Sequence, residues 1–185
     1  MCPRVARDSG CDMGGVLQDH RQACDGLTEV ARRADGRWDS PSPCPEWDAR
    51  GVLEHVIGFH DALLLRPFGA KPKRPKDDPV ERWTLTVDAL FRVLSQPGVL
   101  DEKGSLIGYL TTEVLVHTWD LSRAVGVAVT LDPRLCQVGL DRALANADRL
   151  KRDMFSPALP IPEDASVQDR LLGSFGRDPS WMRPS

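Results

Sequence analysis

The residues best suited to chemistry lie in the stretch 109–126, which reads YLTTEVLVHTWDLSRAVG. Glu113 and His117 are four residues apart in it. On a helix their Cβ atoms would be roughly 5–6 Å apart, so both side chains could reach one ion. They share one helical face with Leu106, Leu110, Asp120 and Ala124. A carboxylate buried there without a partner would cost on the order of several kcal/mol. Glu113 must therefore have a cationic partner or a proton, and the spacing predicts a divalent metal ion as that partner.

A third ligand must come from another element, and His55 is our candidate. It lies on the inward stripe of a helix predicted over residues 49–66, with Val52, Val56, Phe59 and Leu63. If this helix and the one carrying His117 share an end, the two histidines differ in depth by only about 3 Å. His20, on the first predicted helix, would lie roughly 12 Å from His55 along the bundle axis. His60 falls on a neighbouring stripe, and we expect it to be structural or exposed.

Five further residues could contribute to the site or to the fold. Asp120 could accept the second ring proton of His117, or it could pair with Arg123. Cys44 lies in a proline-rich turn with no histidine or cation adjacent in sequence, so we expect a buried structural thiol and not a nucleophile. Arg50, Arg123 and Arg177 are candidate anion contacts. The His-Glu-x-x-His pattern of zinc peptidases is absent, because Val56 follows His55.

Helices are the only elements that the apolar spacing predicts. They are expected at residues 13–34, 49–66, 80–95, from about 105 to 125, 133–153 and 166–175. Asp132 followed by Pro133 is typical of a helix start. The segment 67–79 can extend to roughly 43–47 Å, enough to run back along a helix of 18 residues. The second and third helices can therefore be parallel, which favours an up-down-down-up four-helix bundle with an additional C-terminal helix and an irregular tail.

Composition narrows the class of protein. The 185 residues are sufficient for one buried domain, here 13–185, preceded by a leader over 1–12 that we expect to be flexible. A net charge of −3 gives no basic footprint for nucleic acid, and no apolar run is long enough to span a membrane. No signal-peptide pattern is present, so we expect a cytoplasmic protein whose five cysteines are thiols. The oligomeric state is left open, with a homodimer kept as one alternative.

Four segments resemble the metal-binding domain of mycothiol-dependent maleylpyruvate isomerases, a branch of the DinB-like four-helix bundles. They read WDSPSPCPEWD, LEHVIG, EVLVHTWDLSRAVG and DRLLGSFGRDPSW, and they frame residues from about 15 to 181. The resemblance implies a divalent metal, usually zinc, held here by His55, Glu113 and His117. It also implies mycothiol as a co-substrate. The full isomerases have a further C-terminal domain, and the connection QPGVLDEKG at 96–104 is shorter than in the relatives.

Two functions from different classes fit these observations. The first is a transferase or isomerase dependent on a small thiol such as mycothiol, in which zinc with three protein ligands keeps one position open for the thiol. Its partners would be a small-molecule thiol and an electrophile. The second is a non-catalytic module in which the ion braces the bundle or senses a ligand. Metal-dependent hydrolysis is a third, weaker alternative.

Overall fold

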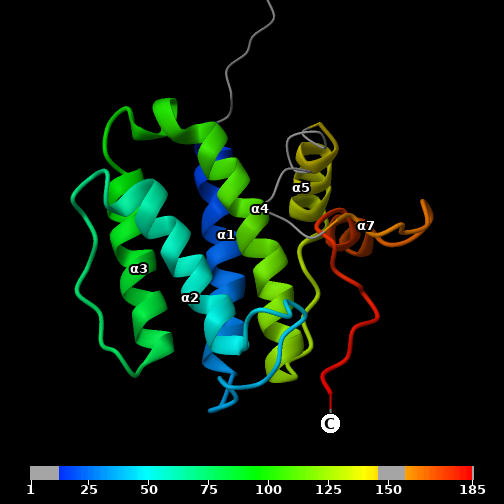
Figure 1. The fold of residues 1–185 in the computed structure, drawn as a ribbon. Coiled ribbons are helices and arrows are strands. Elements are labelled where there is room, and N and C mark those ends of the chain that lie inside the picture. Colours follow the sequence, from blue (N-terminus) through cyan, green and yellow to red (C-terminus); the bar gives the residue numbers. More distant parts are fainter. Residues whose placement is uncertain (1–12, 146–156, 185) are drawn as a thin grey trace, which may run out of the picture.

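The structure is a computed structural model that describes residues 13–145 and 157–184. These residues form helices joined by loops (Figure 1). The α-helices are α1 (Met13–Arg32), α2 (Ala49–His60), α3 (Pro79–Leu94), α4 (Val99–Val125), α5 (Pro133–Ala145) and α7 (Val167–Ser174), and a π-helix, η1 (Asp61–Leu65), continues α2. The described residues contain no β-strand, so the predicted all-α class is confirmed. The expected leader over 1–12 and the end of the helix expected over 133–153 lie outside the described residues.

Local sequence signals set most helix starts. Asp48 caps α2 through a bond from the Gly51 N–H, and Asp78 caps α3 in the same way just before Pro79. As the Asp-Pro pair predicted, Asp132 accepts from the Leu135 N–H at 2.9 Å, and α5 begins at Pro133. Such caps satisfy backbone N–H groups that have no partner within the helix. Among the helices that these ranges contain, none is both long and apolar enough to cross a membrane.

The directions of the first four helices follow from their contacts. His55 on α2 lies beside His117 on α4, and His60, further along α2, lies beside His20, which bonds Thr111 nearer the start of α4. α2 and α4 are therefore antiparallel. Arg82 on α3 pairs with Glu54 on α2, so the second and third helices begin at the same end. Figure 1 shows α1 and α4 running one way and α2 and α3 the other, with the segment 66–78 crossing back along α3.

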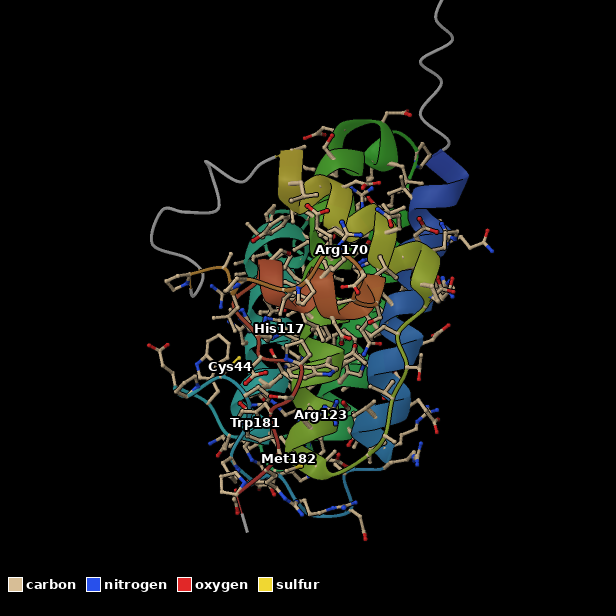
Figure 2. All side chains as sticks on the ribbon, turned by 90° about the vertical axis from the view of Figure 1, so that its right-hand side faces the viewer. Cys44, His117, Arg123, Arg170, Trp181 and Met182 are labelled. Atoms are coloured by element: carbon tan, nitrogen blue, oxygen red, sulfur yellow. The ribbon has the colours of Figure 1, made fainter. Side chains whose placement is uncertain are left out.

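α4 is the central helix of the fold. Every residue from Leu110 to Ser122 is buried, because α1, α2 and α5 all pack against it. α7 packs on α5, and the chain after α7 runs back down past α4 (Figures 1 and 2). Gly126 ends α4 with φ of 68°, the left-handed conformation that favours glycine at this position. A polar side chain on any face of this part of α4 must therefore find a partner inside the protein.

One predicted helix start and one predicted buried position are wrong. The helix after residue 94 begins at Val99, so the connection expected over 96–104 is mostly helical. Asp101 and Glu102 lie in its first turn, where carboxylates favour a helix start. Leu63, expected on the inward stripe of the second helix, is 40% exposed, whereas Leu64 and Leu65 are fully buried. The π-helix explains this difference, since its wider turn shifts which residues face the core.

Candidate metal centre

His55 reaches the interior from the first half of α2. The proline-rich turn before α2 folds back on the helix start, where the Ala49 N–H donates to the Ser40 carbonyl at 2.9 Å. This places the Trp47 ring flat against His55, with ring centroids 4.2 Å apart and 28° between the planes. The Phe59 ring meets His55 edge-on at 5.4 Å. The imidazole is thus held between two aromatic rings, and it is half-buried, with one side toward solvent.

Glu113 and His117 face His55 from α4. Both are buried, and Nε2 of His117 lies 3.6 Å from Oε2 of Glu113. The rings of His55 and His117 are 4.9 Å apart. One ligand atom from each of the three residues lies within 4.8 Å of the other two. The structure therefore brings together the three residues that the sequence analysis selected as metal ligands.

The buried carboxylate of Glu113 fits a cation. Its Oε1 atom has no hydrogen-bond partner among the described residues. A buried carboxylate oxygen without a donor is costly, and a divalent ion would satisfy it. Two imidazoles and one carboxylate are the ligand set of many catalytic zinc sites, which keep a fourth position for water or substrate. The residues present therefore fit a zinc ion.

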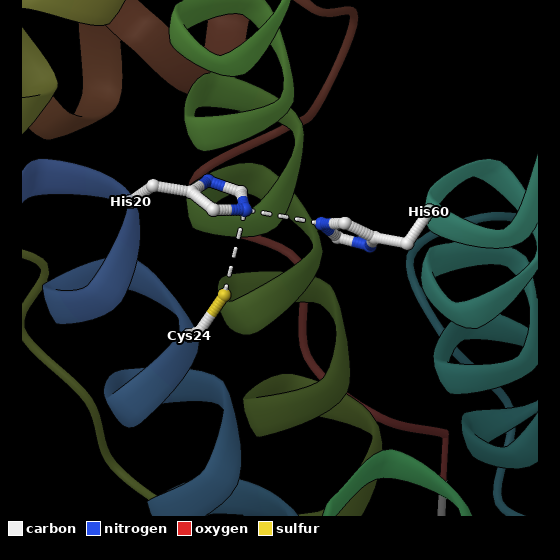
Figure 3. A group of neighbouring side chains, drawn as sticks. All are labelled: His20, Cys24 and His60. Atoms are coloured by element: carbon white, nitrogen blue, oxygen red, sulfur yellow. Dashed lines mark hydrogen bonds between the residues drawn. The ribbon is translucent and has the colours of Figure 1, made fainter. Parts of the chain in front are cut away.

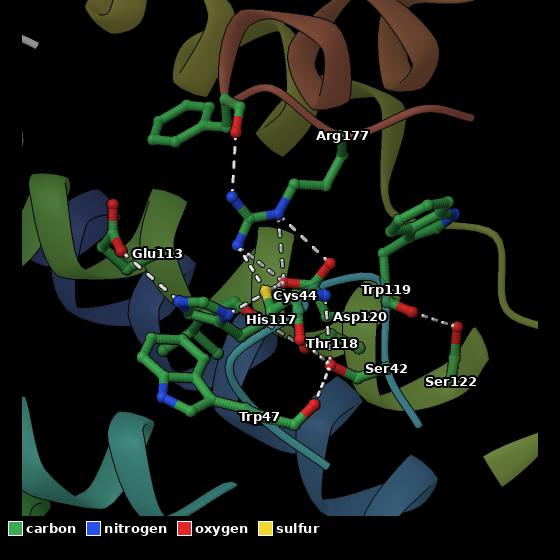
Figure 4. A network of polar contacts seen from close by, with 12 residues as sticks. Ser42, Cys44, Trp47, Glu113, His117, Thr118, Trp119, Asp120, Ser122 and Arg177 are labelled. Atoms are coloured by element: carbon green, nitrogen blue, oxygen red, sulfur yellow. Dashed lines mark hydrogen bonds and ion pairs between the residues drawn. The ribbon is translucent and has the colours of Figure 1, made fainter. Parts of the chain in front are cut away.

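Asp120 fixes the orientation of His117. Its Oδ2 lies 3.0 Å from Nδ1 of His117 (Figure 4). Because a carboxylate accepts, Nδ1 carries a proton, and Nε2 is the atom that faces Glu113 and His55; without its proton, Nε2 could bind an ion there. Of the two roles predicted for Asp120, the structure shows the contact with His117. Arg123 instead lies over the Trp119 ring, 5.3 Å from its centroid.

Arg177 and Cys44 complete this network, and the sequence analysis did not connect them. Arg177 donates to both oxygens of Asp120, at 2.9 and 3.2 Å, and to Sγ of Cys44 at 2.9 Å. The thiol in turn donates to Asp120 Oδ2 at 3.2 Å. Cys44 is buried as expected, but it does have a cation and a histidine nearby in space (Figure 4). Cys44 and Arg177 are 133 positions apart, so neighbours in sequence could not show this contact.

Electrostatics distinguish the two histidines of the site. Burial, followed by the nearby His117, lowers the pKa of His55 to about 4. Burial also acts to lower the pKa of His117, but hydrogen bonds to Asp120, Cys44 and Glu113 outweigh it and hold this pKa well above its usual value. Burial acts to raise the pKa of Asp120, yet His117 and Arg177 bring it below the ordinary range. Asp120 is therefore a carboxylate paired with a cation on either side.

Cys44, His117 and Asp120 form a second group whose ligand atoms lie close enough for one ion. We consider it the weaker site, because the Arg177 guanidinium already contacts both Cys44 and Asp120 and would repel a metal there. Burial also raises the pKa of the Cys44 thiol, which keeps it protonated. The Oε1 atom of Glu113 has no such competing cation in hydrogen-bond contact.

His20 and His60 lie apart from this centre. His20 bonds Thr111, six residues before His117 on α4, which corresponds to roughly 9 Å along the helix. His60, expected to be structural or exposed, is fully buried and contacts His20. Neither histidine belongs to the group of His55, Glu113 and His117.

Fold and site together define an all-helical protein with a buried histidine and carboxylate cluster suited to a metal ion. Residues 20–94 match the model of the mycothiol maleylpyruvate isomerase N-terminal domain family. This segment of the chain is similar to that family. It contains His55, whereas Glu113 and His117 lie beyond the matched residues.

Two relatives are uncharacterized proteins of Mycobacterium tuberculosis, one from strain CDC 1551 and one from strain H37Rv. Each is 28% identical to this chain over an alignment of 179 residues. The match covers 87% of this chain and 97% of the relative. No solved structure matches this chain. The similarity to these relatives therefore extends over α4 and the C-terminal part as well as the family segment.

Proposed function

We propose that this protein binds one zinc ion through His55, Glu113 and His117 and uses it in a reaction that depends on a small thiol, with mycothiol as the best candidate. The observation that carries the proposal is the buried Glu113 carboxylate, whose Oε1 has no donor, whose Oε2 lies 3.6 Å from Nε2 of His117, and which groups with both imidazoles. The name of the matched family supplies the thiol. We also propose a DinB-like bundle, on the basis of the directions of α1 to α4 and this family.

The proposed chemistry requires the ion to bind the thiol. A zinc ion held by His55, Glu113 and His117 would supply a site at which a bound thiol loses its proton at neutral pH. The chain then needs no strong base of its own. His55 is the ligand on the solvent side, because it is half-buried while Glu113 and His117 are buried. The thiol and its electrophile would therefore enter beside His55.

The surrounding residues would hold the ligands and supply a proton donor. Asp120 and Arg177 keep His117 in one orientation, and Trp47 does the same for His55. Tyr109 lies one helical turn before Glu113 and is half-buried. Burial, and then the charge of Glu113, raise the pKa of its hydroxyl, so it stays protonated. The sequence analysis named no proton donor, and Tyr109, which interacts with Glu113, is a candidate.

Cobalt substitution would test the proposal directly. Cobalt(II) replaces zinc in such sites and has visible absorption that reports its ligands. Adding mycothiol to the cobalt-loaded protein should produce a sulfur-to-cobalt charge-transfer band, and His55→Ala should abolish both cobalt binding and the band. A panel of electrophiles would then be screened for conjugation with mycothiol.

The outcomes separate the alternatives. A charge-transfer band with turnover of an electrophile supports the thiol-dependent enzyme. Cobalt bound at the three ligands, with no band and no turnover, would contradict the enzyme and favour the non-catalytic binding module. Hydrolysis of esters or amides without any thiol would instead favour metal-dependent hydrolysis.

A further inference from the structure

A third cluster of side chains that could bind a metal lies between α1 and the end of α2. His20 and Cys24 are one turn apart on α1, and His60 is the last residue of α2 (Figure 3). All three are completely buried. Nε2 of His20 lies 3.2 Å from Nε2 of His60 and 3.8 Å from Sγ of Cys24. None of these residues belongs to the centre of His55, Glu113 and His117.

The hydrogen bonds show which nitrogens carry protons. The Thr111 hydroxyl donates to the Ile107 carbonyl at 2.8 Å, so its oxygen accepts from Nδ1 of His20 at 3.0 Å. Nδ1 of His60 lies 2.8 Å from the Val56 carbonyl, which can only accept. Both Nδ1 atoms are therefore protonated. In the neutral rings, the two Nε2 atoms then face each other with lone pairs and no proton between them.

Two facing lone pairs in a dry interior need a cation. The Cys24 thiol could donate to His20, but the Nε2 of His60 would still lack a donor. A proton shared by the two rings would leave a buried positive charge. Such a charge is costly here, because both rings are completely buried. A metal ion is the cation that can use both lone pairs and the sulfur together.

The separations match a three-coordinate ion. With metal–nitrogen bonds of about 2.05 Å and a metal–sulfur bond of about 2.3 Å, trigonal geometry separates the nitrogens by about 3.5 Å and each nitrogen from sulfur by about 3.8 Å. The observed separations are 3.2 and 3.8 Å. The third, between Cys24 and His60, lies within 4.8 Å. Small movements of the side chains would therefore close the site on an ion.

We propose that His20, Cys24 and His60 bind one copper(I) ion. Soft thiolate ligands favour copper(I), which accepts three ligands, whereas structural zinc almost always takes four. The described group offers three. Charge leads to the same choice, because copper(I), one thiolate and two neutral imidazoles sum to zero, while zinc would leave one net positive charge in the core. On binding, the ion replaces the thiol proton of Cys24, which passes to the buffer.

Competition for copper(I) would test this site. The reduced protein, kept without oxygen, is titrated into the coloured complex of copper(I) with bicinchoninate. Since other thiols of the chain can also take copper, the informative quantity is the difference between variants. The wild type should withdraw one equivalent more than Cys24→Ala. Cys136→Ala removes another fully buried thiol, on α5, and should behave like the wild type. His55→Ala should also leave this copper unchanged.

X-ray absorption of the loaded protein should show two nitrogen ligands and one sulfur ligand around copper. Equal copper uptake by the wild type and Cys24→Ala, or a copper environment made only of sulfur, would overturn the proposal. So would one tightly bound zinc that depends on Cys24, because that result assigns a different ion. Circular dichroism checks that each variant is folded, and His60→Gln, which should also lose the copper, replaces Cys24→Ala if that variant does not fold.

Discussion

The two ring nitrogens of His117 have different partners, and this asymmetry is the basis of the proposed centre. Nδ1 faces the Asp120 carboxylate at 3.0 Å, and Nε2 faces Glu113 at 3.6 Å. Asp120 is fully buried and is itself held by Arg177. Such outer contacts fix a metal-binding histidine in one tautomer and one orientation. Asp120 therefore acts on the proposed ion only through His117.

Asp120→Asn should weaken zinc binding by about 10–100-fold, the range typical when a partner of a metal ligand is lost. The amide keeps the shape of the side chain but loses the charge that orients Nδ1–H. Competition with a zinc chelator dye measures the change. An affinity equal to that of the wild type would contradict the role of Asp120, and complete loss of zinc would indicate that it is a ligand.

How far the sequence specified this centre depends on the distance between partners. Glu113 and His117 are neighbours on one helix, so their spacing predicted a shared site. The approach of His55 required a guess about helix directions, which three contacts among α1, α2, α3 and α4 now support. Arg177 could not be placed, because it lies in an irregular segment after α7 and reaches Asp120 across 57 positions. Helical periodicity contains no information about such a segment.

At the scale of elements, the π-helix η1 shows the same limit. The inward stripe of α2 predicted Leu63 to be buried, and the wider turn exposes it instead. Asp61, the first residue of η1, is buried and held by two bonds from Arg74, at 2.7 and 2.9 Å. Arg74 belongs to the connection between α2 and α3, which the sequence analysis described only as a segment long enough to run back along a helix. The ion pair instead fixes this segment to the end of α2.

Asp61→Asn should therefore destabilise the fold at neutral pH by about 3–5 kcal/mol, because it leaves the buried Arg74 without its counter-charge. Burial acts to raise the pKa of Asp61, but Arg74 and Lys71 bring it below the ordinary value. A carboxylate with a lowered pKa stabilises the fold above its unfolded pKa and loses this contribution as the pH falls through the folded value. The difference from the wild type should thus shrink below about pH 4.

Denaturant unfolding at several pH values measures this difference. Asp77→Asn is a matched control, because Asp77 is exposed in the same connection, and it should change the free energy of unfolding by less than about 0.5 kcal/mol. If Asp61→Asn lowers the free energy of unfolding by the same amount down to pH 3, the charge of Asp61 is not the cause of the destabilisation.

At the scale of the whole molecule, Arg177 joins parts that are distant in sequence. It contacts Asp120 on α4, Cys44 in the turn before α2 and the Phe175 carbonyl at the end of α7. The C-terminal segment is thereby fixed to the bundle beside the candidate centre. Figure 2 shows Cys44 and His117 close together on the side of the molecule where this segment descends.

Arg177→Met should destabilise the whole chain by about 3–5 kcal/mol, since the buried Asp120 loses a cationic partner. Arg183→Ala is the control, because Arg183 is exposed and makes one long bond, at 3.3 Å, to the Ala124 carbonyl. Its effect should stay below about 0.5 kcal/mol. Thermal unfolding followed by circular dichroism compares the two variants. Equal melting temperatures would contradict the anchoring role of Arg177.

The central claim is that His55, Glu113 and His117 hold one zinc ion together, and zinc titration of matched variants tests it most directly. The wild type should bind one zinc per chain at this centre. His55→Ala and Glu113→Gln should each lose affinity by more than the roughly 100-fold limit of changes outside the ligands. His20→Ala should keep this zinc, because His20 contacts α4 roughly 9 Å away. If His20→Ala releases the ion while His55→Ala retains it, the proposed centre is wrong.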